Sequence, residues 1–184
     1  MVITLFIDFD KITISMISTK FASSLFGLFF ITCTAFSQVL QPARLLVETP
    51  AGTFRTGDII EVTFQATIDN NWYLYSVGFD PDCGPIAMLV SFEKNSSFEL
   101  AGPLTAVQDK AKHDKIFDCD VRTFEHTGVF KQKIKILSSP LKLAGTYEGQ
   151  ACSEVEGKCV LVDGDFSIEN IQVEQKNGAA AMPP

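Results

Sequence analysis

Apolar and polar residues alternate strictly between Ile60 and Ile68. Isoleucine, valine, phenylalanine and alanine occupy every even position of this segment, and glutamate, threonine and glutamine occupy every odd one. Successive side chains of a β-strand point to opposite faces, so the segment would place one face on a hydrophobic core and the other in water. The pattern predicts a half-buried strand.

The rest of the chain extends this pattern. Further strands are predicted at residues 44–48, 72–77, 86–93, 98–101, 121–126, 129–137, 143–151 and 160–173. Turn-forming residues separate them at intervals that are typical of a sandwich, and no segment has helical periodicity over three turns. Because so many short strands must bury single apolar faces against each other, we expect one all-β domain, an immunoglobulin-like antiparallel β-sandwich.

The N-terminal region has the pattern of a secretory signal peptide. Residues 21–36 are mostly apolar, Lys20 precedes them, and residues 35–37 form a small-x-small cleavage pattern. The apolar stretch is short and interrupted by serine and threonine, whereas a membrane-spanning helix needs about 20 predominantly apolar residues. We therefore expect residues 1–37 to be a cleaved signal peptide that directs the chain to the periplasm.

The remaining chain has the length of one domain. We expect the folded domain at residues 38–175 and a flexible tail at residues 176–184, where no pattern could bury anything. Met16 is the better candidate for the true start, because the acidic segment before it lacks the basic character of a signal peptide. The net charge of −7 disfavours nucleic acid and anionic membranes as partners, since both require a basic surface.

Motifs for hydrolytic, nucleotide or metal chemistry are missing from the sequence. It contains two histidines, His113 and His126, and none of the usual hydrolase, phosphate-loop or zinc-protease motifs. The cysteines lack the paired C-x-x-C spacing of structural zinc sites. We expect no cofactor and no metal.

Two cysteines near the C-terminal end have hairpin spacing. Cys152 and Cys159 flank a short polar loop that contains Gly157. Directly opposed residues of an antiparallel pair have Cα atoms roughly 4.5 to 5.5 Å apart, so a disulfide could close without backbone movement. Such a small ring contributes only about 2.5 kcal/mol to stability. Redox chemistry is therefore a serious alternative to a purely structural role.

Pairing Cys152 with Cys159 leaves Cys83 with Cys119. A bridge between Cys83 and Cys119 would close a much longer loop and contribute about 3.8 kcal/mol, which makes it the better structural disulfide. The fifth cysteine, Cys33, lies in the predicted signal peptide and is expected to be removed with it. Other pairings of the remaining four cysteines stay open from the residues alone. So does a purely stabilising role for both bridges in an exported domain.

Several segments, in this order, resemble a known family. They are 72–76 (WYLYS), 84–85 (GP), 113–118 (HDKIFD), 130–132 (FKQ) and 147–152 (YEGQAC) followed by Cys159. Together they resemble the N-terminal periplasmic domain of the thiol:disulfide interchange protein DsbD over nearly the whole chain after the signal peptide. The resemblance implies an immunoglobulin-like domain whose paired cysteines carry electrons from a membrane domain to exported acceptors, such as disulfide isomerases and cytochrome c maturation thioredoxins.

The resemblance also implies roles for individual residues. Cys159 would attack the disulfide of the acceptor, and Cys152 would resolve the mixed disulfide. Phe117 occupies the place of an aromatic residue that shields the sulfurs from a cap loop in the family, although the residues alone also allow it to be one more core phenylalanine. Glu154 and Glu156 would raise the thiol pKa values and Lys158 would lower them, so charge leaves the better nucleophile undecided.

The sequence departs from the family pattern in three ways. Val160–Val162 follow the second cysteine where family members carry prolines, and the membrane and C-terminal thioredoxin domains of the full family protein are missing. We therefore expect a membrane electron donor that is encoded separately. Cys83 and Cys119 are additional, and their positions beside Gly84 and the cap loop lead to the hypothesis of a bridge that stiffens the cap.

Three classes of function follow. The first is a thiol:disulfide interchange module of the protein-disulfide reductase type that acts on exported thioredoxin-fold proteins. The second is a non-catalytic immunoglobulin-like binding or assembly module with purely structural disulfides. The third is a carrier of a small ligand at one end of the sandwich, for which no residue identifies the ligand.

Overall fold

The structure is a computed structural model that describes residues 40–174. The signal peptide predicted at 1–37 and the tail predicted at 176–184 lie outside the described residues. Strands connected by turns and one short 3-10 helix, η1 (Pro81–Cys83), make up the described part. In this part of the chain no helix has the length and apolar character needed to cross a membrane.

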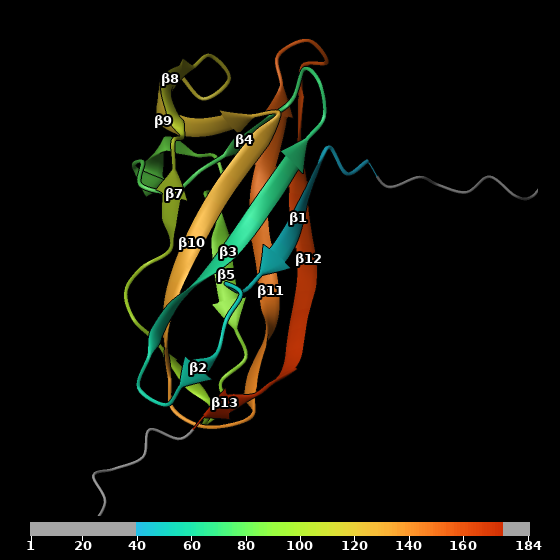
Figure 1. Cartoon of the computed structure of the whole chain (residues 1–184). Coiled ribbons are helices and arrows are strands. Elements are labelled where there is room, and N and C mark those ends of the chain that lie inside the picture. Colours follow the sequence, from blue (N-terminus) through green and yellow to red (C-terminus); the bar gives the residue numbers. More distant parts are fainter. Residues whose placement is uncertain (1–39, 175–184) are drawn as a thin grey trace, which may run out of the picture. The chain divides into compact units, whose positions relative to one another are not determined.

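Two antiparallel sheets form the body of the fold (Figure 1). The first has the strand order β1-β3-β10-β6, and β7 also pairs with β10. Its strands are β1 (Ala43–Glu48), β3 (Ile59–Ile68), β10 (Thr127–Ile136), β6 (Phe98–Leu100) and β7 (Thr105–Val107).

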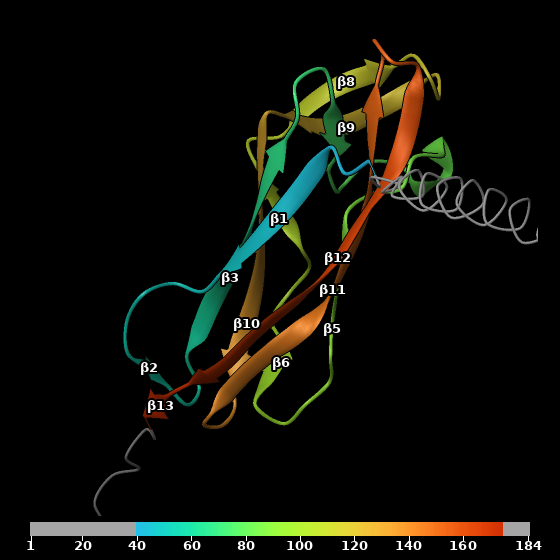
Figure 2. The same cartoon turned by 90° about the vertical axis from the view of Figure 1, so that its right-hand side faces the viewer.

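The second sheet has the order β12-β11-β4-β9-β8, and β5 also pairs with β11. Its strands are β12 (Lys158–Ile171), β11 (Leu141–Ser153), β4 (Tyr73–Tyr75), β9 (Cys119–Glu125), β8 (Lys110–Asp114) and β5 (Leu89–Phe92). A short parallel pair, β2 (Phe54–Arg55) and β13 (Val173–Glu174), lies outside both sheets. Figure 2 gives the side view, with β3 and β10 on one side and β11 and β12 on the other.

The core lies between the two sheets. In β3 every even residue from Ile60 to Ile68 is buried, and the odd residues are half-buried or exposed. Phe64 is fully buried and meets the ring edges of Phe92 and Phe166, with ring centroids 6.1 and 5.2 Å away. Burying an aromatic side chain of this size stabilises the fold by about 1.5 to 3 kcal/mol. The predicted all-β, immunoglobulin-like antiparallel sandwich is confirmed.

Some strands differ from the predicted ones. β5 is shorter than the predicted 86–93 segment, and β8 was not predicted because its sequence, KAKHD, has no alternating apolar residues. β12 runs without interruption through Gly164, where the ring of the cross-strand Tyr147 occupies the space that a side chain would need. Glycine in a strand is typical of such close approaches.

One strand is buried on both faces, and this creates a second cluster. In β4, Leu74 belongs to the main core, whereas Tyr73 and Tyr75 point to the opposite face of the sheet. There they form a smaller apolar cluster with Val121 and Cys152. The cysteine hairpin thus lies against its own small core rather than on a bare sheet surface.

Candidate functional site

Cys152 and Cys159 form a disulfide across the β11–β12 hairpin. The two residues are directly opposite each other in the register of the strands, and their Cα atoms are 4.1 Å apart. Gly157 makes the turn with a φ of 63°, in the left-handed region that favours glycine. Antiparallel pairing therefore holds the two sulfurs together.

The two cysteines differ in exposure. The Cys152 side chain is fully buried, whereas Cys159 is half-buried and borders a hollow at the surface. The residues that line this hollow with Cys159 are Lys115, Ile116, Glu154, Gly157 and Lys158. Cys159 is therefore the sulfur that another molecule can reach.

A turn of the neighbouring hairpin contributes to the same apolar cluster as the pair. β8 and β9 are joined by residues 115–118, which we call the cap loop. Its Phe117 packs, half-buried, into the cluster that contains Cys152 and Cys159, and its ring meets the Tyr75 ring edge-on at 6.1 Å. The structure thus brings Phe117 and the two cysteines into one apolar cluster.

The buried carboxylate of Asp114 anchors the cap loop. Its Oδ2 accepts hydrogen bonds from the hydroxyls of Tyr73 (3.0 Å) and Tyr75 (2.6 Å). Its Oδ1 accepts from the backbone amides of Ile116 (2.8 Å) and Phe117 (3.2 Å). One side chain therefore joins β4, which pairs with β11 beside Cys152, to the cap loop.

These contacts also determine the protonation state of Asp114. Burial alone would raise the pKa of Asp114, but the hydrogen bonds from Tyr75 and the loop amides outweigh it and hold this pKa below its ordinary value. Burial raises the pKa of Tyr73 to about 12, and burial together with the Asp114 contact raises the pKa of Tyr75. The site therefore holds a charged acceptor between two protonated donors.

Charged side chains beside the hairpin are paired. Lys112 Nζ lies 2.9 Å from Glu154 Oε1, and Lys115 Nζ lies 3.6 Å from its Oε2. Lys158 Nζ lies 2.6 Å from Glu156 Oε2. The hydrogen bonds to Lys112 and Lys158 lower the pKa values of Glu154 and Glu156, respectively. Lysine charge thus offsets the two glutamates that would have raised the thiol pKa values.

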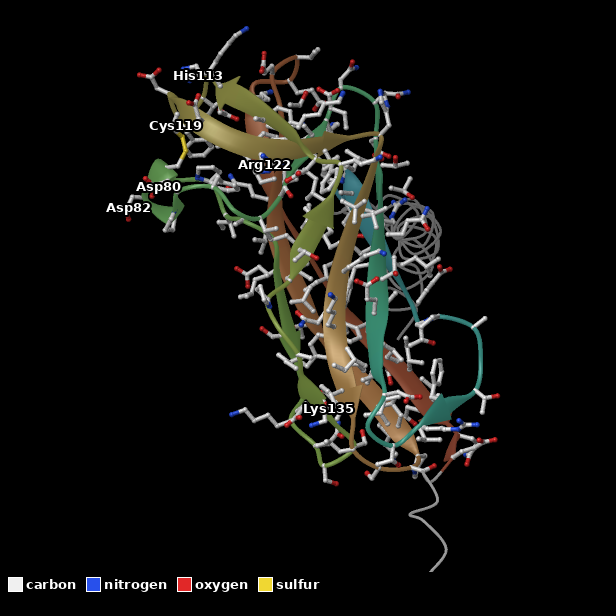
Figure 3. All side chains as sticks on the ribbon, turned by 60° about the vertical axis from the view of Figure 1, so that its left-hand side comes forward. Asp80, Asp82, His113, Cys119, Arg122 and Lys135 are labelled. Carbon is white, nitrogen blue, oxygen red and sulfur yellow. A yellow bond between two sulfur atoms is a disulfide. The ribbon has the colours of Figure 1, made fainter. Side chains whose placement is uncertain are left out.

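A second disulfide lies at the edge of the same cluster. Cys83 at the end of η1 is bonded to Cys119, the first residue of β9, with Cα atoms 5.9 Å apart. Figure 3 shows the yellow sulfur bond at Cys119, with Asp80 and Asp82 nearby in the turn that carries Cys83. Both cysteines are half-buried and pack against Tyr75 and its neighbours.

A family match covers all of these features. The model of the family described as "Thiol:disulfide interchange protein DsbD, N-terminal" matches residues 42–170. The chain belongs to this family. The match to the DsbD N-terminal family includes the cysteine hairpin, the cap loop, and both Cys83 and Cys119. It confirms the resemblance stated from the sequence.

Two solved structures are similar to this DsbD N-terminal family member at low identity. The N-terminal domain of Neisseria meningitidis DsbD in the reduced form is 20% identical, covering 69% of this chain and 86% of that chain with a TM-score of 0.45. A structure of the complex between the DsbD and PilB N-terminal domains of the same organism is 15% identical, covering 72% and 89%, with a TM-score of 0.43. A comparison with curated proteins finds no match.

Residues that the sequence analysis missed surround the predicted ones in this DsbD N-terminal domain. Asp114 is the main omission, with its two tyrosine donors and with Lys112. Asp114 lies three residues before Phe117, inside the 113–118 segment that carried the family resemblance, and this was the available signal. In residues 40–174, no group of three or more His, Cys, Asp or Glu side chains could hold a metal ion.

Proposed function

We propose that this chain is an exported thiol:disulfide interchange module that passes electrons from a Cys152/Cys159 dithiol to the disulfide of an acceptor protein. One observation carries the proposal. A cross-strand cysteine pair, with one buried and one half-buried cysteine, shares an apolar cluster with Phe117 in a member of the DsbD N-terminal family. A bridge with a purely structural role would need no such asymmetry.

The geometry supports a two-step exchange. In the reduced state the Cys159 thiolate attacks one sulfur of the acceptor disulfide, and the other acceptor sulfur leaves as a thiolate. The Cys152 thiolate then attacks the Cys159 sulfur of the mixed disulfide and releases the second acceptor thiolate. Two electrons reach the acceptor, and its thiolates take up two protons. The 4.1 Å separation of the Cα atoms keeps the resolving cysteine within reach throughout.

The surroundings of the cap loop are consistent with access to the cysteine pair that a bound partner controls. Phe117 packs against the cysteine cluster, and Ile116 beside it is 45% exposed. Val155, on the cysteine hairpin, is 76% exposed. A partner that buries these two apolar side chains would gain about 1 kcal/mol from each, because both are already partly buried, and could move the cap loop at the same time.

Partners and location follow from the family. We propose acceptors that are exported thioredoxin-fold proteins of the disulfide isomerase or cytochrome c maturation type. We propose a membrane protein, encoded separately, as the electron donor, and the periplasm as the location. A domain that cycles between dithiol and disulfide needs a donor, because each exchange leaves Cys152 and Cys159 oxidised.

A trapping experiment tests the function. The Cys152→Ser variant of the exported chain should accumulate a mixed disulfide between Cys159 and an exported thioredoxin-fold protein, since no resolving thiol is present. Non-reducing electrophoresis and mass spectrometry identify the adduct. Cys159→Ser is the matched control and should trap far less, because Cys152 is buried.

The reduction potential of the Cys152/Cys159 couple decides between interchange and the non-catalytic binding module. We expect a value above about −300 mV, since structural disulfides usually lie below it. A lower value, with no adduct from Cys152→Ser, would favour an assembly module with inert bridges.

A further inference from the structure

The Cys83–Cys119 disulfide joins the two segments that hold Phe117. Cys119 follows the cap loop directly, and Cys83 ends the turn formed by residues 80–84, which we call the seat turn. The bridge spans 36 residues of sequence, so it connects elements that are otherwise distant along the chain. Figure 3 shows Cys119 and the labelled seat-turn residues at the same end of the domain.

Gly84 of the seat turn supports the Phe117 ring directly. A Cβ atom at Gly84 would lie only 2.8 Å from Phe117 Cδ1, so the ring rests on bare backbone. The φ of 110° at Gly84 also lies where side chains are disfavoured. The position of the seat turn therefore determines where the Phe117 ring can lie.

Residues 80–84 themselves have few other ties to the domain, and the flanking ties are the packing of the Phe79 ring on Tyr75 and the hydrogen bond from the Ile86 amide to Gln150 Oε1 (2.9 Å). The hydrogen bonds of the seat turn within the described residues are internal, from the amides of Asp82 (2.9 Å) and Cys83 (3.1 Å) to Asp80. Its further polar contacts involve the bridge itself: Cys119 Sγ lies 3.4 Å from the Cys83 carbonyl oxygen, and Cys83 Sγ lies 4.0 Å from that of Asp120. Opening the bridge would remove the covalent tie of the turn to β9.

The cap loop, in contrast, is held independently at its other end. Asp114 accepts the amides of Ile116 and Phe117, so the start of the loop keeps its place without the bridge. Loss of the bridge would therefore release the support under the Phe117 ring rather than unfold the hairpin. Both bridging cysteines are half-buried rather than enclosed, so a thiol can reach them.

We propose that Cys83–Cys119 is a second exchangeable disulfide that acts as a redox lock on the cap loop and is opened by an exported dithiol. When closed, the bridge holds the seat turn under Phe117 and slows exchange at Cys152–Cys159. When open, it lets the ring move and widens the access to Cys159 that the closed state allows. The proposal rests on the interchange function proposed above and adds a second redox site that regulates it.

The opening reaction is an ordinary exchange. A thiolate of the dithiol attacks one sulfur of the bridge and forms a mixed disulfide, while the other sulfur leaves as a thiolate and takes up a proton. The second thiol of the dithiol loses its proton and displaces the cysteine still attached. Two electrons pass to Cys83 and Cys119, which become thiols, and the dithiol becomes a disulfide.

The first test compares rates of reduction. Dithiothreitol is added in the same large excess to the wild-type chain and to the Cys83→Ser/Cys119→Ser variant, and the initial rate of loss of the Cys152–Cys159 bond is followed by alkylation and mass spectrometry. We expect the rate of reduction of Cys152–Cys159 to be about 5 to 30 times higher in the variant. A modest shift in the equilibrium between closed and open positions of the cap loop changes their ratio by such a factor. Equal rates would overturn the lock and leave the interchange function standing. Resistance to reduction in both chains would overturn both proposals.

The matched control removes the ring. With Phe117→Ala in both backgrounds, the presence or absence of the bridge should no longer change the rate, since there is no ring to support. A bridge effect that persists at full size without the ring would overturn the lock.

The second test uses the wild-type chain and does not depend on the folding of a variant. The chain is equilibrated over a series of ratios of reduced to oxidised dithiothreitol, and each cysteine pair is quantified. We expect Cys83–Cys119 to open over the same range of ratios as Cys152–Cys159, with faster hydrogen exchange at the Asp82 and Cys83 amides of the seat turn once it is open. A Cys83–Cys119 bridge that stays closed when Cys152–Cys159 is fully reduced would overturn the proposal.

Discussion

The Tyr75 hydroxyl donates a 2.6 Å hydrogen bond to the buried carboxylate of Asp114. This contact connects β4, the strand that pairs with β11 beside Cys152, to the cap loop, because the same carboxylate accepts hydrogen bonds from the Ile116 and Phe117 amides. The position of the cap loop therefore depends on one charged side chain.

Replacing this carboxylate should destabilise the domain. Asp114→Asn keeps the shape but replaces one acceptor oxygen by an amide donor, so a buried tyrosine hydroxyl or backbone amide loses its partner. We expect the free energy of unfolding to fall by about 1 to 3 kcal/mol, measured by urea denaturation. Tyr75→Phe leaves the Tyr73 and amide contacts in place, so it should lower the free energy of unfolding by less than Asp114→Asn does. An Asp114→Asn chain as stable as wild type would contradict the anchoring role.

The contribution of Asp114 should depend on pH in a defined direction. Its pKa is lowered in the folded state, so its stabilisation is fully present above the unfolded value of about 3.9 and is lost as the pH falls through the lower folded value. The stability difference between wild type and Asp114→Asn should therefore be smaller at about pH 3 than at pH 7. Denaturation of both chains at the two pH values checks this, and an unchanged difference would contradict it.

The contribution of His113 to the stability of the domain should depend on pH in the opposite direction to that of Asp114. Its ring nitrogens lie 3.0 Å from Asp120 Oδ1 and 3.2 Å from Asp118 Oδ1, and hydrogen bonds to these two carboxylates raise its pKa. A raised pKa gives stabilisation that is fully present below the unfolded value of about 6.5 and is lost as the pH rises through the folded value. His113→Gln should therefore lower stability more at about pH 5.5 than at about pH 9. An equal effect at both values would show that the ring charge contributes nothing.

Two glycines allow a test of whether the Gly84 backbone supports the Phe117 ring, with Gly78 as the matched control. Gly84 and Gly78 both have positive φ values, 110° and 77°, but only the Gly84 position faces the Phe117 ring, and Gly78 has open space around it. Alanine at either position should lower the free energy of unfolding by more than about 1 kcal/mol, because it strains the backbone. Only Gly84→Ala should also displace the ring and speed reduction of Cys152–Cys159 by dithiothreitol. Equal reduction rates in the two variants would contradict the support of Phe117 by Gly84.

The fold was predictable because its signals are local. The alternation from Ile60 to Ile68 corresponds to the buried face of β3, and the spacing of Cys152 and Cys159 corresponds to directly opposed positions of a hairpin. Strand β8 was not predictable in this way. Its residues are polar, and it becomes a strand through its pairing with β9 and the burial of Asp114.

The charges around the site could not be predicted from neighbours in the sequence. Glu154 lies next to Ser153 on the cysteine hairpin, but its partner Lys112 is 42 residues away. From the sequence, Glu154 was expected to act on the thiols as a free charge. In the fold, Lys112 and Lys115 offset it, and this pairing required the β8–β9 hairpin to lie against the β11–β12 hairpin.

The amino-acid sequence by itself determined the sandwich, the cysteine hairpin and the family, because side-chain alternation, turn residues and motif order are properties of neighbouring positions. Only the tertiary structure decided which sulfur is reachable, what holds Phe117 in place, and that Cys83 and Cys119 are paired at the edge of the same cluster. Burial and long-range hydrogen bonds arise when distant strands pack together. Asp114, an ordinary charged residue in the sequence, therefore becomes the anchor of the cap only in the folded domain.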